Sequence, residues 1–139
     1  MAFKNVFIDT NILVDVFANR KPFVENSLKI YNLCIKRKIK LFTSSNTITT
    51  IHYILKKTIS EDKARMAIEH IVEYANIIPV DITIIRKSLK SNHKDFEDAI
   101  QIVAAESISD MDCIVTRDLK DYKNAQIDVL TPDEFLNTL

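Results

Sequence analysis

The chain has 139 residues, of which 47% are hydrophobic and 27% charged, and its formal net charge is zero. This length predicts a single domain over residues 1–139 with room for a buried core. The neutral balance gives no sign of an overall positive field for nucleic acid, and the absence of glycine excludes the usual Walker and dinucleotide-binding loops.

The sequence also lacks signals for a membrane or an oxidising compartment. No apolar run approaches the roughly 20 residues of a membrane span, and residues 1–9 lack the apolar stretch and cleavage site of a signal peptide. Cys34 and Cys113 lie in apolar segments, as unpaired core cysteines do, and the three histidines show no zinc-ligand spacing. We therefore expect a cytoplasmic protein with no membrane association, no disulfide and no zinc site.

Short apolar runs alternate with helical patterns along the whole chain. The runs predict strands, and apolar residues three and four positions apart predict amphipathic helices. In chain order, we expect a strand at 4–8, helices at 12–17 and 23–38, a strand at 41–42, helices at 47–57 and 60–75, a strand at 77–80, helices at 82–89 and 95–108, strands at 112–116 and 128–130, and a short last helix.

The ends of these elements carry recognisable boundary signals. A polar cluster at 43–46 caps the third predicted helix, and the segment 131–134 matches a capping box with proline at the first helical position. Pro79 suggests that the third strand lies at a sheet edge. Alternating strands and helices predict an α/β fold, a three-layer α/β/α sandwich around a parallel five-stranded sheet.

Aspartates are expected at one edge of this sheet. Asp9 ends the first strand and Asp118 follows the fourth, whereas Asp95 and Asp98 lie in the first turn of the helix that leads into the fourth strand. Ligands of an open parallel sheet bind beyond the carboxyl ends of the strands, so these groups can meet there. Crowded carboxylates raise one another's pKa or share a cation. Such hard ligands suit Mg²⁺ or Mn²⁺, which can activate water for phosphodiester hydrolysis.

Each aspartate also has a purely structural interpretation. Asp9 can cap the helix that follows it, as Thr10 or Asn11 could. Asp95 is a natural N-cap with Asp98 at the third helical position, where the helix dipole stabilises a carboxylate. Asp118 can belong to a turn. The sequence alone leaves both interpretations open for each residue taken singly, and the combination of strand-end positions favours a site.

Basic residues gather near the ends of three predicted helices, at residues 36–40, 56–57 and 86–94. Solvated helix C-termini explain each cluster by itself, because cations interact favourably with the helix dipole there. Clusters that converged near a carboxylate site would suit a phosphodiester backbone.

Four segments resemble, in order and spacing, the motifs of PIN-domain proteins. They are residues 6–15 (VFIDTNILVD), 95–101 (DFEDAIQ), 114–122 (IVTRDLKDY) and 130–136 (LTPDEFL). The resemblance spans essentially the whole chain and implies an α/β/α sandwich with Mg²⁺- or Mn²⁺-dependent ribonuclease activity on single-stranded RNA. Many bacterial members of this size are VapC-type toxins of toxin–antitoxin pairs. The resemblance thus also implies a homodimer and a cognate antitoxin.

Carried over by position, the resemblance assigns roles to individual residues. Asp9, Asp98 and Asp118 would be metal ligands. Asp95 and Asp121 would be secondary acids in or near the site, and either Asp118 or Asp121 could face the metal. The supporting residues share hydrogen-bonding side chains, which in Asn11 and Thr116 would orient ligands; they are Asn11, Thr116, Thr10 and Thr50.

One position departs from the family pattern. The family usually carries a glutamate on the helix after the second strand, and Thr50 stands there in this chain. No acidic residue lies between Glu25 and Glu61. A hydroxyl can hydrogen-bond to water but brings no charge, which should weaken cation binding. We hypothesise that Asp95, one turn before Asp98, compensates.

Two other functions compete with a ribonuclease. Thr50 favours a catalytically weakened or inactive PIN-like module that binds RNA or protein. A different acidic Mg²⁺ site fits less well. A phosphatase of this type needs Asp-x-Asp after the first strand, where Asn11 stands, and a receiver domain with Asp81 as its phosphoacceptor needs a lysine that residues 130–132 do not supply.

Overall fold

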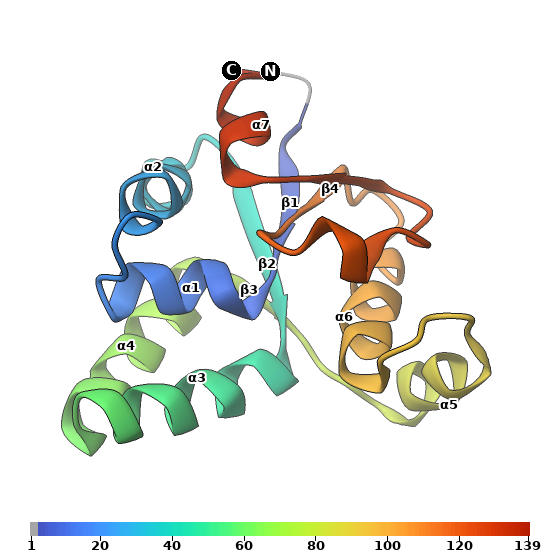
Figure 1. Cartoon of the computed structure of the whole chain (residues 1–139), viewed down its shortest axis with the longest axis horizontal. Coiled ribbons are helices and arrows are strands. Elements are labelled where there is room, and N and C mark those ends of the chain that lie inside the picture. Colours follow the sequence, from blue (N-terminus) through green and yellow to red (C-terminus); the bar gives the residue numbers. More distant parts are fainter. Residues whose placement is uncertain (1–2) are drawn as a thin grey trace.

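The computed structural model describes residues 3–139, in which a parallel five-stranded sheet separates two groups of helices (Figure 1). Met1 and Ala2, part of the segment tested above for a signal peptide, lie outside the described residues. The strands share short, mostly buried sequences and are β1 (Asn5–Ile8), β2 (Lys40–Ser44), β3 (Asn76–Ile78), β4 (Cys113–Val115) and β5 (Asp128–Leu130). Their order across the sheet is β3-β2-β1-β4-β5, and all neighbours are parallel.

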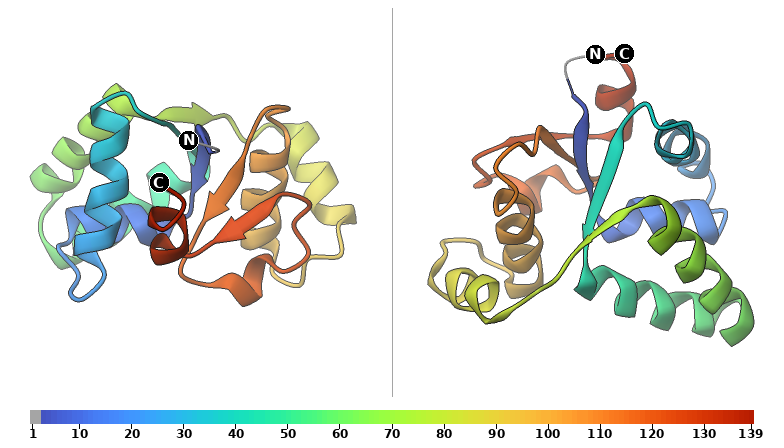
Figure 2. Two further views of the ribbon diagram at one scale, coloured as in Figure 1. Left: turned by 90° about the horizontal axis from the view of Figure 1, so that it is seen from above. Right: turned by 180° about the vertical axis from the view of Figure 1, so that it is seen from behind.

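Helices cover both faces of the sheet. They are α1 (Thr10–Phe17), α2 (Val24–Ile35), α3 (Ser45–Thr58), α4 (Glu61–Tyr74), α5 (Ile82–Lys90), α6 (Phe96–Glu106), the short 3₁₀ helix η1 (Leu119–Tyr122) and α7 (Pro132–Leu136). Figure 2 shows α3 and α4 together on the side of the molecule away from α5. The predicted α/β/α sandwich is therefore confirmed.

Alternation along β1 explains why two separate cores form. Val6 and Ile8 point into a core shared with α1 to α4 and α7, whereas Phe7 points into a second core shared with α5, α6 and η1. All three side chains are fully buried. Successive residues of a strand face opposite sides, so an uninterrupted apolar strand needs helices on both faces.

The strand register sets the position of the acidic residues. Ile8 of β1 pairs with Val115 of β4, so the residues that follow them leave the same edge side by side. The Asp9 amide still donates to the Val115 carbonyl at 3.0 Å. Short-range capping and sheet pairing thus bring together two segments more than one hundred residues apart.

The element boundaries depart from the sequence expectation in several places. The predicted helix 23–38 ends at Ile35, because the chain reverses through Arg37, which has a left-handed φ of 60°. The third strand is at the sheet edge as predicted, but Pro79 lies just beyond it. The 3₁₀ helix η1 was not expected, because a segment of four residues is too short to show a helical spacing of apolar residues. Across residues 3–139, no helix has the length and apolarity to cross a bilayer.

Candidate active site

A chain of hydrogen bonds links the ends of β1 and β4. The Thr116 hydroxyl donates to Asp9 Oδ2 at 2.8 Å and accepts from the Asp118 amide at 3.0 Å. Asn11 Nδ2 donates to Asp118 Oδ2 at 3.2 Å. The second oxygen of Asp9 accepts from the Thr10 amide at 2.7 Å, which caps α1. Asp9 is therefore both a helix cap and a member of this acidic group.

Asp98 reaches the same group from the first turn of α6. Partial burial, followed by the charges of Asp95, Asp121, Asp9 and Asp118, raises the pKa of Asp98 to about 7. Like charges disfavour a further negative charge at short range. Asp98 is thus held near the point where it exchanges a proton at neutral pH, and a cation placed among these carboxylates would relieve the repulsion.

Burial is also the main reason that the pKa of Asp9 is raised, and the Thr116 and Thr10 hydrogen bonds partly offset it. A second buried group stands beside Asp9. The Tyr122 side chain is 1% exposed, and burial followed by the neighbouring Asp9 charge raises its pKa. The Tyr122 hydroxyl faces the Asp9 carboxylate, and a hydrogen bond between them lowers the pKa of Asp9, whereas Asn11 Oδ1 is buried without a partner among residues 3–139. Unpaired buried polar atoms are costly, and at a functional site they await a ligand, ion or water.

A buried polar network supports the site from β2 and α3. Gln101, one turn after Asp98, donates to the Thr47 hydroxyl at 2.9 Å and accepts from the Ser44 hydroxyl. The Thr47 hydroxyl in turn contacts the Thr10 hydroxyl at 3.0 Å. Ser44, Thr47 and Gln101 are buried, and Thr10 is partly buried. Because Thr10 begins α1 and bonds to Thr47 of α3, the network holds the start of α1 against α3 and α6.

Thr10, Thr47 and Gln101 of this network line a cleft of about 570 Å³. Its walls share polar side chains from α1, α3 and α6, and its acidic members are Asp9, Glu97, Asp98 and Asp118. Thr50 also faces this cleft, although its hydroxyl donates to the Asn46 carbonyl at 3.1 Å. Among the cleft-lining residues that the structure describes, only Arg20 is a cation.

The donor chemistry of this cleft fits a hard divalent cation. Within residues 3–139, no three acidic, histidine or cysteine side chains stand close enough to enclose an ion by themselves. Mg²⁺ does not need such a cage, because it keeps several waters and binds through one or two carboxylates. The hydrogen-bonded Asp9 and Asp118, the repelled Asp98 and the unpartnered Asn11 Oδ1 supply oxygen atoms of the required kind.

A buried ion pair anchors the segment that carries Thr116 and Asp118. Arg117 Nε and Nη2 donate to the two oxygens of Asp15 at 2.9 and 3.1 Å. The Asp15 side chain is fully buried, whereas that of Arg117 is 24% exposed, and the guanidinium lies 3.8 Å from the centre of the Phe23 ring. The loop after β4 is thereby tied to α1, which carries Asn11.

The structure thus brings Asp9, Asp98 and Asp118 to one cleft, but it separates the two secondary acids from the cleft wall. Asp95 caps α6, with its Oδ1 accepting from the Asp98 amide at 3.0 Å, and neither Asp95 nor Asp121 lines the cleft. Both still act on Asp98 through their charge. The structural interpretation of Asp95 as an N-cap is confirmed.

Sequence reasoning missed other residues of the site. Gln101 and Tyr122 lay in the recognised motifs without a role, although the spacing from Asp98 to Gln101 places both on one helix face. Thr47 follows the capping cluster at 43–46 and gave no signal of its own. Arg20 gave none, because its approach to the cleft depends on how the chain turns after α1.

Fold and site together define an α/β/α protein with an acidic cleft at the carboxyl edge of its sheet. A family model described as PIN domain matches residues 5–120. The chain is 34% identical over 137 residues to Ribonuclease VapC1 of Aquifex aeolicus (strain VF5), which covers 95% of this chain and 93% of that protein. The chain therefore belongs to the PIN-domain family, as the resemblance of its motifs implied.

Solved structures agree with this assignment. A toxin–antitoxin complex from Klebsiella pneumoniae aligns with a TM-score of 0.67 and 25% identity, over 92% of this chain and 98% of that chain. DNA-bound VapBC from Salmonella typhimurium aligns with a TM-score of 0.69 and 18% identity, over 94% and 99% respectively. At that identity, the second likeness supports the fold alone.

Proposed function

We propose that this protein is a metal-dependent endoribonuclease that cleaves single-stranded RNA, and that it is the toxin of a toxin–antitoxin pair. The observation that carries the proposal is the placement of Asp9, Asp98 and Asp118 around one cleft at the sheet edge. The similarity to Ribonuclease VapC1 over nearly the whole chain supports the choice of RNA as substrate.

The chain's own residues have distinct tasks in this reaction. A bound Mg²⁺ or Mn²⁺ supplies an acidified water and offsets negative charge on the phosphodiester. Thr116 and Thr10 hold the Asp9 carboxylate in one orientation, and Asn11 does the same for Asp118. Because these donors are fixed, the two carboxylates are already oriented before a cation binds. This arrangement is preorganised, since the carboxylates need not reorient during the reaction.

Asp98 has a separate task. Without a cation, burial and the neighbouring acids raise the pKa of its carboxyl to about 7, and a bound cation would favour the ionised form that can ligate it. Thr50 contributes a hydroxyl but no charge in the position of the usual glutamate. We propose that the charges of Asp95 and Asp121, which act on Asp98 from outside the cleft, partly replace it.

Partners follow from the same proposal. The structural neighbour from Klebsiella pneumoniae is a toxin–antitoxin complex, which supports a protein antitoxin for this chain. A homodimer and a cytoplasmic location belong to the proposal as well. A short neighbouring gene that encodes a DNA-binding protein, and co-purification of its product with this chain, would test the antitoxin.

Cleavage of labelled single-stranded RNA in Mn²⁺, and its loss in EDTA, tests the activity itself. Asp9→Asn and Asp98→Asn should each abolish cleavage while the urea unfolding curve shows an intact fold. Asp110→Asn is the matched control, because Asp110 is an exposed aspartate before β4, at the opposite sheet edge. Metal-dependent cleavage that persists in both site variants would refute the mechanism.

The second candidate is a non-catalytic module that binds RNA or protein on the same fold. Thr50 favours it, because the site has one carboxylate fewer than the family pattern. Purified protein that binds RNA equally well in Mn²⁺ and EDTA, and leaves it intact in both, would establish this function instead.

A further inference from the structure

The acidic cleft presents an electrostatic problem for its proposed substrate. Four carboxylates line it, whereas Arg20 is its only cation among the described residues. A phosphodiester strand is itself negative, and its affinity for proteins comes mainly from neutralisation of phosphates by cations. One metal ion and one arginine cannot neutralise several phosphates, so positive groups outside the cleft are needed.

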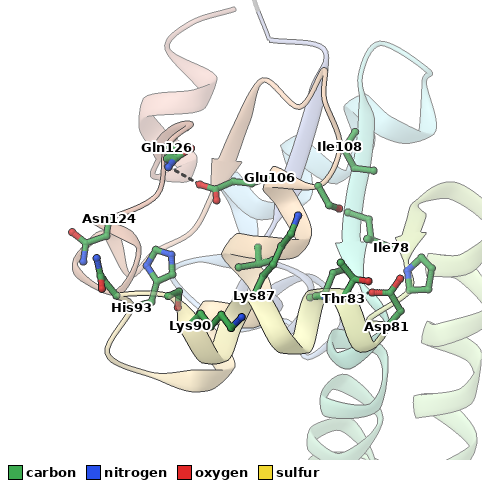
Figure 3. Close-up of a pocket in the computed structure, with 16 residues that line it drawn as sticks. Ile78, Asp81, Thr83, Lys87, Lys90, His93, Glu106, Ile108, Asn124 and Gln126 are labelled. Carbon is green, nitrogen blue, oxygen red and sulfur yellow. Dashed lines mark hydrogen bonds between the residues drawn. The ribbon is translucent and has the colours of Figure 1, made fainter.

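A separate cavity of about 1040 Å³ lies between α5, α6 and the loop that precedes β5 (Figure 3). This volume lies slightly above the range of roughly 300–1,000 Å³ found for ligand pockets. Figure 3 shows His93 and Asn124 together at one end, Ile78 and Asp81 at the other, and Lys87 between them. Partly buried apolar side chains, among them Val103 and Ile108, also line it.

The cations of this cavity are available for a ligand. Lys87 and Lys90 are exposed and lie in the last turn of α5, and neither has a carboxylate within 4.0 Å among residues 3–139. Two carboxylates also line the cavity, and each accepts a backbone hydrogen bond that holds its position without removing its charge. Asp81 accepts from the Ile84 amide at 3.0 Å, and Glu106 accepts from the Gln126 amide at 2.7 Å.

The cavity is continuous in the chain with the acidic site. His93 precedes the α6 cap Asp95 by two residues, and Asn124 follows Tyr122 by two. Both segments therefore run directly from one end of the cavity into the group of acids around Asp98. The start of α6 therefore stands between the acidic cleft, which Asp98 lines, and the cavity, which His93 lines.

We propose that this α5–α6 cavity is a second RNA subsite, which holds the phosphates of a single strand beyond the point of cleavage. Lys87 and Lys90 neutralise phosphates, His93 and Asn124 donate hydrogen bonds, and the apolar wall faces the bases. The inference rests on the proposed ribonuclease function and assigns it an extended single-stranded substrate. The basic cluster at 86–94 thereby gains a function beyond that of a solvated helix end.

RNA binding by the Asp98→Asn protein, which does not consume its substrate, tests the subsite. We expect the double change Lys87→Ala/Lys90→Ala to raise the Kd of a fluorescein-labelled oligouridine of about 12 nucleotides by about tenfold. It should also reduce the slope of log K against log salt by about 1.4, or about 0.7 for each lost phosphate contact. Lys87→Arg/Lys90→Arg keeps both positive charges and should therefore leave the Kd of the oligouridine near that of the parent protein.

Lys36→Ala/Lys38→Ala is the matched control. It removes the same charge from exposed residues between α2 and β2, at the opposite edge of the sheet, and should change the Kd by less than about twofold. Urea unfolding of each variant establishes that the fold is retained. An equal loss in both double variants would assign the effect to net charge and overturn the subsite.

The remaining outcomes separate the subsite from the function. Wild-type cleavage of RNA, together with binding that is insensitive to Lys87→Ala/Lys90→Ala, overturns the subsite and leaves the ribonuclease standing. Binding that depends on these lysines, without cleavage by the wild type, supports the subsite and refutes the ribonuclease. If the double change weakens only a labelled polyglutamate peptide and not RNA, the cavity belongs to an acidic protein segment, and the proposal fails.

Discussion

Replacement of Arg117 by methionine should destabilise the protein far more than an ordinary change at a partly exposed residue. Methionine keeps much of the aliphatic length but removes both hydrogen bonds to Asp15 and the contact with the Phe23 ring. The Asp15 carboxylate is fully buried and keeps only the Ser27 hydroxyl, at 3.3 Å, as a partner. In the Arg117→Met protein, the Asp15 carboxylate would therefore be a buried negative charge without a cation beside it and without contact with solvent.

The expected loss of unfolding free energy follows from the difference in burial between Asp15, which is fully buried, and Arg117, which is partly exposed. Removal of one partner from a buried ion pair typically costs about 3–5 kcal/mol, because the remaining charge is uncompensated. Asp15→Asn should cost only about 1 kcal/mol, since the amide oxygen still accepts from Arg117 and the guanidinium reaches solvent. In the Arg117→Met background, Asp15→Asn should restore about 2 kcal/mol, because it removes the stranded charge.

Equilibrium unfolding in urea measures all four members of this cycle. With a slope of about 2 kcal/mol per molar urea, a loss of about 4 kcal/mol lowers the midpoint by roughly 2 M. The two substitutions together should therefore be less harmful than Arg117→Met alone. Equal costs for the two single changes, or a double variant less stable than either, would refute the reasoning from burial.

Three further predictions concern the acidic cleft. Because the folded pKa of Asp98 is raised from 3.8 to about 7, the wild-type free energy of unfolding in EDTA should fall as the pH rises from about 4 to about 7. Asp98→Asn should remove about 1 kcal/mol of that decline, a value discounted for solvent screening, and urea curves at several pH values measure it. Tyr122→Phe removes the hydroxyl that faces the Asp9 carboxylate, so it should lower the rate of RNA cleavage in a timed gel assay while changing the unfolding free energy by no more than about 1 kcal/mol. Thr50→Glu should tighten Mn²⁺ binding by on the order of tenfold in calorimetry, since it adds a carboxylate to the cleft wall; unchanged affinity would show that Thr50 does not face the ion.

Local signals in the sequence predicted most of the elements. Ser60 caps α4, Asp95 caps α6, and the capping box at Thr131 forms with Glu134 as expected. Each of these interactions joins residues three positions apart, so a short stretch of sequence contains both partners. The boundary at Ile35 was missed because the reversal at Arg37 needs a left-handed backbone conformation that no glycine announces in this chain.

The candidate site was predictable only as separate acidic motifs. Asp9, Asp98 and Asp118 could be selected because each follows a strand or opens a helix at the carboxyl edge of a parallel sheet. Their approach depends on the adjacency of β1 and β4, which the sequence could not specify. Strand order is decided by which arrangement buries both faces of every strand and lets the crossover helices pack.

The sequence by itself determined the alternation of strands and helices, the helix caps and the set of acids, because contacts between near neighbours dictate them. Tertiary structure alone decided the hydrogen bond from Asn11 to Asp118, the ion pair of Asp15 with Arg117, and the burial of Tyr122 beside Asp9. These contacts join residues more than one hundred positions apart. Their geometry depends on how the whole sheet and its two helical layers pack, and no local pattern carries that information.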